Sequence, residues 1–154
     1  MSLMKTQKAV PIVLRESVEG VQILVFTHPV AGVQLVKGSV EPGESASEAA
    51  LRELEEESGI TEAVAVQSLG SWESGYQEQT WHLQEVRPSS PLPSQWEHFT
   101  QDGGGHLFAF HWHALAAEPS QEWHPVYRAV LREVTSRLYA IRREPHPPVP
   151  RGAA

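Results

Sequence analysis

Residues 38–60 read GSVEPGESASEAALRELEEESGI, and this stretch carries most of the charge of the chain. It holds seven glutamates and a single basic residue, Arg52, which gives it a local charge of −6. The rest of the chain has 12 acidic and 11 basic residues, so the net charge of −7 is concentrated in one short segment. A charge that only keeps a protein soluble would be scattered, and this segment therefore needs a specific explanation.

The segment contains the start and end signals of a helix. Ser45 and Glu48 form the S-x-x-E pattern of a capping box, which places the helix start at Ser45. Gly59 is suited to the left-handed conformation that commonly ends a helix. We therefore predict a helix over residues 45–58.

The carboxylates of this helix gather on one face. Advancing by 100° per residue puts Glu53, Glu56 and Glu57 within about 100° of one another. A separate side of the helix carries the apolar residues that would face the core: Ala50, Leu51 and Leu54. Because like charges at this spacing repel, a divalent cation with a preference for oxygen ligands, Mg²⁺ or Mn²⁺, would explain the arrangement. A solvated acidic face is the alternative, and the helix alone does not decide between them.

The wider spacing resembles the Nudix hydrolase signature, G-x5-E-x7-R-E-U-x-E-E-x-G-U, in which U is a bulky aliphatic residue. Every defined position is matched, by Gly38, Glu44, Arg52, Glu53, Leu54, Glu56, Glu57, Gly59 and Ile60. Nine defined positions within one short segment make this a specific signal. The resemblance implies an α/β (α+β) fold, a Nudix-type α/β/α sandwich around a mixed β-sheet.

The resemblance also implies metal-assisted hydrolysis of a nucleoside diphosphate linked to another moiety, such as a nucleotide sugar, a nucleoside triphosphate or a dinucleoside polyphosphate. By this resemblance Glu53, Glu56 and Glu57 would bind Mg²⁺, with Mn²⁺ as a possible substitute. Arg52 would orient one of them through an ion pair, and Glu44 would be an outer support or a further ligand. The glycines would have structural roles: Gly38 would allow the tight loop and Gly59 the helix exit.

The general base is open between several glutamates. A carboxylate must accept the proton of the attacking water, and we name Glu56 or Glu57 for this step. Some members of the family use a glutamate from a later loop instead. Glu97 is a candidate of that kind, and spacing does not select it over Glu85 or Glu122.

Three residues outside the signature are candidates for substrate binding besides Glu97. Lys37 resembles the lysine-glycine entry of the dinucleoside polyphosphate and inositol pyrophosphate branches, although Val36 stands where proline is usual. It would either contact a phosphate as a point charge or be a solvent-facing lysine at a strand end. Trp96 and Phe99 are pocket candidates because they lie on a segment that we expect to be irregular, and core packing is the alternative for each.

The rest of the sequence predicts one layered domain over residues 4–144. Runs of β-branched and apolar residues predict strands, and apolar spacing predicts a second helix over residues 125–143. The expected strands cover residues 9–14, 21–26, 34–37, 64–72, 80–86 and 106–113. Prolines and glycines predict a long functional loop over residues 87–105. We expect residues 1–3 to be an expression remnant and residues 145–154 to be a flexible, proline-rich tail.

Composition excludes several classes of protein. The absence of cysteine excludes disulfides, thiolate metal sites and cysteine nucleophiles. No apolar run reaches the roughly 18 residues of a membrane span, and with no secretory signal visible we expect a cytoplasmic protein. The acidic balance argues against nucleic acid as a partner. By resemblance the partner would be a small nucleotide diphosphate derivative. By resemblance a homodimer is possible, and the alternative functions are a non-catalytic nucleotide-sensing Nudix module or an RNA 5′-end pyrophosphohydrolase.

Overall fold

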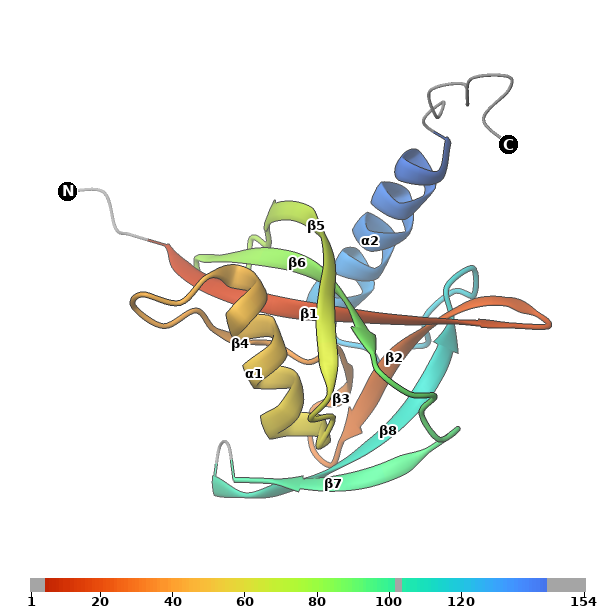
Figure 1. The fold of residues 1–154 in the computed structure, drawn as a ribbon, viewed down its shortest axis with the longest axis horizontal. Helices are drawn as coiled ribbons and strands as arrows, with labels where there is room; N and C mark the ends of the chain where they lie inside the picture. Colours follow the sequence, from red (N-terminus) through yellow and green to blue (C-terminus); the bar gives the residue numbers. More distant parts are fainter. Residues whose placement is uncertain (1–4, 102–103, 144–154) are drawn as a thin grey trace, which may run out of the picture.

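A mixed β-sheet organises the fold in the computed structural model, which describes residues 5–101 and 104–143. The main path of the sheet runs in the order β5-β6-β1-β2-β8-β7, while β3 pairs with β2 and β4 with β1 (Figure 1). The strands are β1 (Thr6–Ser17), β2 (Gly20–His28), β3 (Gly32–Gln34), β4 (Gly38–Ser39), β5 (Ala63–Glu73), β6 (Gln79–Pro88), β7 (Trp96–Thr100) and β8 (His106–Ala114). The predicted N-terminal remnant and C-terminal tail lie outside the described residues.

Strand β1 joins the two halves of the sheet. Its residues 6–13 pair in parallel with β6, and its residues 14–17 pair antiparallel with β2. Near its N-terminal end it also pairs with the two residues of β4, through Lys8 and Ala9. The first glycine of the acidic signature is therefore fixed to the central strand of the sheet.

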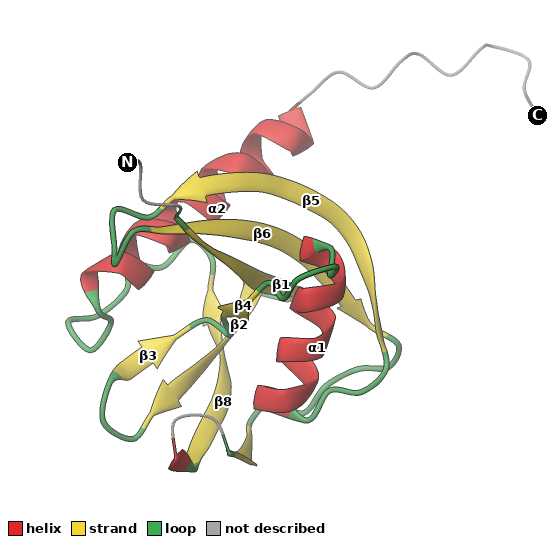
Figure 2. Cartoon of the chain, turned by 90° about the vertical axis from the view of Figure 1, so that its left-hand side faces the viewer, coloured by secondary structure: helices red, strands yellow, loops and turns green. Residues whose placement is uncertain are grey.

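Two helices cover opposite faces of this sheet, α1 (Ala46–Ser58) and α2 (Pro125–Arg143) (Figures 1 and 2). Side chains of β1 alternate between the faces, as expected for a strand buried on both sides. Val10 and Ile12 join the cluster that includes α2, whereas Ala9 and Val13 join the cluster that includes α1. The predicted α/β/α sandwich is confirmed.

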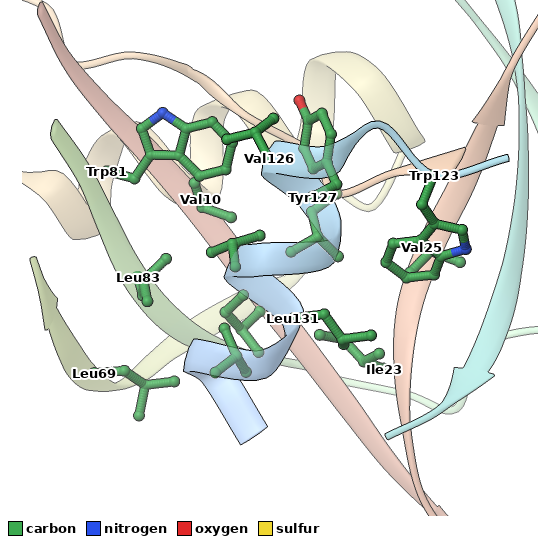
Figure 3. Packing of buried hydrophobic residues seen from close by; sticks show 14 of the residues in the cluster. Val10, Ile23, Val25, Leu69, Trp81, Leu83, Trp123, Val126, Tyr127 and Leu131 are labelled. Carbon is green, nitrogen blue, oxygen red and sulfur yellow. The ribbon is translucent and has the colours of Figure 1, made fainter. Parts of the chain in front are cut away.

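Each helix packs on its own hydrophobic cluster. The cluster under α2 contains Trp81 and Leu83 from β6, with Val126 and Leu131 from the helix (Figure 3). The cluster under α1 is built on residues that include Ala50 and Leu54 of the helix and Phe26, Phe108 and Phe110 of the sheet. Full burial of such a side chain contributes roughly 1.5–3 kcal/mol, so α1 is anchored by its apolar side while its acidic face remains available.

The ends of α1 follow the predicted signals. The Ser45 side chain accepts a hydrogen bond from the Glu48 backbone, and the Glu48 carboxylate accepts one from the Ser45 backbone. Gly59 ends the helix with a φ of 82°, and its N–H donates to the Glu55 carbonyl. The capping box and the left-handed glycine are both confirmed.

Two sequence predictions about the strands are wrong. The third strand covers Gly32–Gln34 rather than residues 34–37, so Lys37 lies in the connection that leads into β4. The expected loop over residues 87–105 contains β7, which pairs antiparallel with β8. Because prolines precede this five-residue strand and glycines follow it, the sequence pattern predicted a loop here. Trp96 and Phe99 consequently lie on a strand and not on an irregular segment.

No helix within the described residues is long and apolar enough to cross a membrane.

We predict that replacing Gly59 by alanine destabilises the fold more than the same change at Gly43. Both glycines have positive φ values, 82° and 81°, so each substitution costs about 1 kcal/mol for the left-handed backbone. At Gly59 the new Cβ would also lie 2.9 Å from Nδ1 of His98, whereas it meets nothing within 4 Å at Gly43. Urea unfolding should show at least about 1 kcal/mol of additional loss for Gly59→Ala, and equal losses would contradict this packing.

Candidate active site

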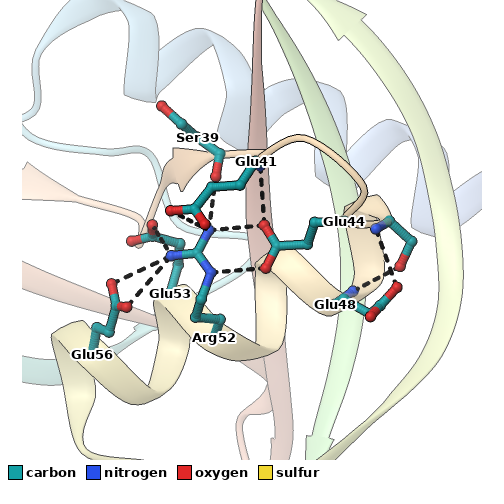
Figure 4. A network of polar contacts seen from close by, with 8 residues as sticks. Ser39, Glu41, Glu44, Glu48, Arg52, Glu53 and Glu56 are labelled. Atoms are coloured by element: carbon teal, nitrogen blue, oxygen red, sulfur yellow. Dashed lines mark hydrogen bonds and ion pairs between the residues drawn. The ribbon is translucent and has the colours of Figure 1, made fainter.

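Arg52 is the centre of a polar network that joins α1 to the loop before it (Figure 4). Its Nε and Nη2 donate to the two carboxylate oxygens of Glu44 at 2.8 and 2.9 Å, and Nη1 donates to Glu53 at 2.8 Å. Nη2 also donates to the carbonyl of Ser39 at 2.9 Å. The guanidinium therefore clamps the preceding loop and one helix carboxylate in a fixed geometry.

Two further carboxylates lie at longer range from the same guanidinium. The oxygens of Glu56 are 3.4 and 3.5 Å from Nη1, and an oxygen of Glu41 is 3.9 Å from Nη2. Four carboxylates thus surround one cation. The predicted ion pair of Arg52 is confirmed, and it holds Glu44 and Glu53 most closely.

These contacts favour the charged forms of Glu44 and Arg52. The hydrogen bonds from Arg52, together with one from the Glu41 backbone, lower the pKa of Glu44 to about 2. In return, the carboxylates of Glu44 and Glu53 raise the pKa of Arg52. Arg52 thus holds Glu44 through both of its carboxylate oxygens.

Glu53 and Glu57 are buried, with 7% and 8% of their surface exposed, whereas the side chain of Glu56 is 45% exposed. The backbone passes very close to the first of them, since a Cβ added to Gly38 would lie 1.8 Å from Cδ of Glu53. The backbone N–H of Lys37 donates to Oε2 of Glu57 at 3.4 Å. Gly38 is therefore required because no side chain fits between the backbone and this carboxylate.

The acidic face retains an excess of negative charge. Arg52 contacts Glu41, Glu44, Glu53 and Glu56, and the amine of Lys37 interacts electrostatically with Glu57, so two cations face five carboxylates. Across residues 5–101 and 104–143, no three carboxylate or imidazole groups gather closely enough to hold a metal by themselves. Mg²⁺ does not need such a cage, since it keeps several waters and takes one or two carboxylates plus substrate phosphates. A buried carboxylate pair with surplus negative charge fits that demand.

Lys37 lies inside a ring of aromatic side chains beside Glu57. Its Nζ is 4.6 Å from the ring centroid of Trp81, 5.4 Å from that of Tyr76 and 5.7 Å from that of Tyr127. Burial, with a smaller contribution from Lys8, lowers the pKa of Lys37 to about 8, although Glu57 opposes the shift. The three ring faces favour the protonated amine. Lys37 is thus a half-buried cation and not a solvent-facing lysine.

A cavity of about 250 Å³ opens next to this lysine. Its wall includes Glu57 from the acidic face and two of the three aromatic side chains around Lys37, Tyr76 and Tyr127. The other lining residues are Phe26, Ala31, Gln34, Leu35, Lys37 and His124. The ring of His124 lies edge-on to Tyr76, with 5.3 Å between their centroids. The cavity therefore combines aromatic surfaces with a cation and a carboxylate.

The remaining predicted residues lie on β7 and point in different directions. Trp96 is turned toward α1, where its Nε1 donates to the Ser58 carbonyl at 2.9 Å and its ring stacks on Phe110. Glu97 and Phe99 alternate with it and are exposed on the other face of the strand. The structure brings neither of these two to the acidic face of α1, and packing is the observed role of Trp96.

Sequence reasoning missed Gln79, whose Oε1 accepts hydrogen bonds from both Nζ of Lys37 and Nε1 of Trp81, at 3.3 and 2.8 Å. It also missed the place of Tyr127 and His124 in the cavity wall, and it preferred Trp96 and Phe99 to Tyr76, which does line the cavity. Gln79 begins β6, Tyr127 lies in the first turn of α2 and His124 directly precedes that helix, and no spacing rule connects them to Lys37. The one available signal in the sequence was Gln79 itself, a polar residue at the start of a strand that is otherwise mostly buried.

The geometry can now be compared with known proteins. A sequence model of the NUDIX domain matches residues 5–135, which is most of the chain. The chain belongs to the Nudix family. It is a Nudix hydrolase, and hydrolases of this family act on pyrophosphate bonds. No curated protein matches the Nudix chain.

Solved structures share the fold of this Nudix hydrolase at low sequence identity. A UDP-X diphosphatase is 14% identical with a TM-score of 0.65, over 93% of this chain and 66% of its own. An ADP-ribose pyrophosphatase from Streptococcus suis is also 14% identical with a TM-score of 0.65, over 93% of this chain and 96% of its own. An Ap4A hydrolase from C. elegans is 20% identical with a TM-score of 0.59, over 88% of this chain and 98% of its own.

We predict that Glu44 reports directly on the Arg52 clamp. In the wild-type Nudix hydrolase the Glu44 carboxylate should titrate with a pKa of about 2, because Arg52 stabilises its charged form. Arg52→Gln should return this pKa to the usual range of a glutamate, near 4.3. Carbon-detected NMR titration measures the value, and Arg132→Gln on α2 is the control for loss of an arginine. A Glu44 pKa that stays low in Arg52→Gln would contradict the clamp.

Proposed function

We propose that the chain is a Mg²⁺-dependent pyrophosphohydrolase that cleaves a nucleoside diphosphate linked to another moiety, with Mn²⁺ as a possible substitute. The observation that carries this proposal is the wall shared by Glu57 and Lys37 in one cavity. A diphosphate placed across that wall would meet the acidic metal-binding face on one side and a protonated amine on the other. This pairing suits a substrate that is negatively charged and metal-bound.

The buried pair, Glu53 and Glu57, would hold the metal ion, and Arg52 would keep Glu53 in place. When bound, the ion would neutralise phosphate charge and lower the pKa of an attacking water. Glu56 is the better of the two named bases because its carboxylate is exposed and can pass a proton to solvent. Glu44 would act as the support of Arg52, consistent with its two hydrogen bonds to the guanidinium.

The cavity supports a nucleotide derivative as the substrate. Tyr76 and Tyr127 offer aromatic surface for a base or sugar, and Gln34 and His124 add polar groups. The three similar structures are named for a UDP derivative, ADP-ribose and Ap4A, which all contain a nucleoside diphosphate group. A non-catalytic nucleotide sensor would tolerate loss of the signature glutamates, and this chain retains all of them.

A panel of nucleotide sugars, nucleoside triphosphates and dinucleoside polyphosphates with Mg²⁺ tests the proposal. We expect hydrolysis of at least one compound, with release of a nucleoside monophosphate, and no turnover in EDTA. Tight binding of a compound without cleavage would favour the sensor and overturn the enzymatic proposal.

Substitutions on α1 test the assignment of the carboxylates. Glu56→Gln and Glu57→Gln should each lower kcat by about a hundredfold or more, because each removes a charge from the reacting face. Glu55→Gln is the matched control, since Glu55 belongs to the same helix and is exposed away from that face. Circular dichroism checks that all three variants fold. Wild-type rates in both test variants would show that the site is wrongly assigned.

Lys37 should make substrate binding sensitive to alkaline pH. As pH rises through about 8 the amine loses its proton, so attraction to phosphate is lost and KM should increase. Lys37→Met keeps an apolar side chain among the three surrounding aromatic residues but removes the amine. This variant should show a high KM at every pH. Lys5→Met, which changes a surface lysine paired with Glu73, is the control. A wild-type pH profile in Lys37→Met would exclude a role for this amine.

A further inference from the structure

A second cavity lies at the other end of the central strand. It has a volume of about 420 Å³ and lies between the end of β1, the segment that follows β6, and β8. Its wall is formed by Val13, Leu14, Arg15, Glu16, Arg87, Pro88, Ser89, Ser90, Pro91, Leu92 and Trp112. None of these residues lines the cavity beside Glu57.

The two cavities are separated along β1. Ala9 pairs with Gly38 at the start of the acidic signature, whereas the second cavity begins at Val13. Four residues of extended strand span about 13 Å. In Figure 1, α1 and β4 lie toward the left of the sheet, and the connection between β6 and β7 lies at the right. A ligand in the second cavity would therefore not contact the acidic face.

Arg15 is held rigidly at the edge of this cavity. Its Cζ lies 4.2 Å from the ring centroid of Trp112, and its Nε donates to Oε1 of Gln22 at 2.7 Å. Trp112 is fixed in turn, since its Nε1 donates to the Pro93 carbonyl at 3.0 Å. The orientation of the guanidinium is thus set by a ring on one face and a hydrogen bond at Nε, with no ligand needed to order it.

The terminal nitrogens of Arg15 have no counterion. Within residues 5–101 and 104–143, every ion pair involves Lys5, Arg52 or Arg137, and none involves Arg15 or Arg87. Two arginines and one glutamate line the cavity, so it is a positive site in a chain of net charge −7. A guanidinium with both terminal nitrogens available matches the paired oxygens of a carboxylate or a phosphate.

The rest of the wall is mainly apolar. Val13, Leu92 and Trp112 belong to or pack against the cluster under α1, and two prolines complete this surface. Such a wall suits the apolar or aromatic body of a small molecule, while Arg15 suits its charged end. Repulsion from the acidic face would keep the same anion away from the metal site in the absence of metal.

We propose that this cavity is a second, metal-independent binding site for a small organic anion, a carboxylate or phosphate monoester carried on an aromatic or apolar body. Arg15 binds the anionic group through its terminal nitrogens, and the body of the ligand lies against Leu92 and the prolines. The site is separate from the metal face and from the cavity that contains Lys37.

NMR titration of the full chain in EDTA tests this proposal. The probes are AMP, as a phosphate monoester, and 3-phenylpropionate, as a carboxylate; adenosine and 3-phenylpropanamide are their neutral counterparts. We expect one or both anions to shift the amides of residues 13–16 and 88–92 and the indole N–H of Trp112, while those of residues 37–39 and 53–57 stay in place. The neutral counterparts should bind at least about tenfold more weakly. Comparing the two anions shows whether the site prefers a phosphate monoester or a carboxylate.

Variants at Arg15 decide whether the guanidinium is responsible. Arg15→Gln should weaken binding of the anion at least about tenfold, and Arg15→Lys should not restore it because the forked geometry is lost. Arg132→Gln is the control. If Arg15→Gln does not fold, comparing each anion with its neutral counterpart on the wild-type chain still tests the site. The proposal is overturned if neither anion binds at millimolar concentration, if the neutral counterparts bind equally well, or if a folded Arg15→Gln binds the anion as well as wild type does.

Discussion

The contact between Arg52 and its surrounding carboxylates is the interaction on which the site depends. Without a cation at its centre, the acidic face of α1 would be a set of mutually repelling charges beside a tightly packed backbone. The fork of Arg52 donates to both oxygens of Glu44 and to one oxygen of Glu53, and it also donates to the carbonyl of Ser39. One side chain thereby fixes the loop, the helix and the direction of a buried carboxylate.

The Arg52 contacts do not neutralise all of the negative charge at the site. Arg52 offsets only part of the surrounding negative charge, and Lys37 adds a second cation that interacts with Glu57. The buried carboxylates are therefore pre-oriented on a face that carries more glutamates than cations, and on the proposed function this face would take up a hard cation together with a phosphate. The net charge of −7 is best understood as the charge of this face, since the rest of the chain is nearly neutral.

Sequence reasoning was accurate where the determinants are local. The start and end of α1 follow from Ser45, Glu48 and Gly59, because capping involves residues within one or two turns. The surroundings of Lys37 were beyond it, because Gln79 and Tyr127 reach the amine only through sheet pairing and the docking of α2. Strand β7 was missed for the same reason: five residues between breakers become a strand only by pairing with β8. Once β7 is recognised as a strand, the alternation of side chains explains why Trp96 faces α1 while Glu97 and Phe99 lie on the other face.

Paramagnetic broadening by Mn²⁺ tests the central claim most directly, because it locates the ion without any assumption about the substrate. Substoichiometric Mn²⁺ added to the ¹⁵N-labelled chain should broaden the amides of Lys37, Gly38 and Ser39 and of residues 53–57. Excess Mg²⁺ should reverse the effect by competition. Broadening centred elsewhere on the chain, or no localised broadening at all, would contradict the assignment of the acidic face of α1 as the metal site.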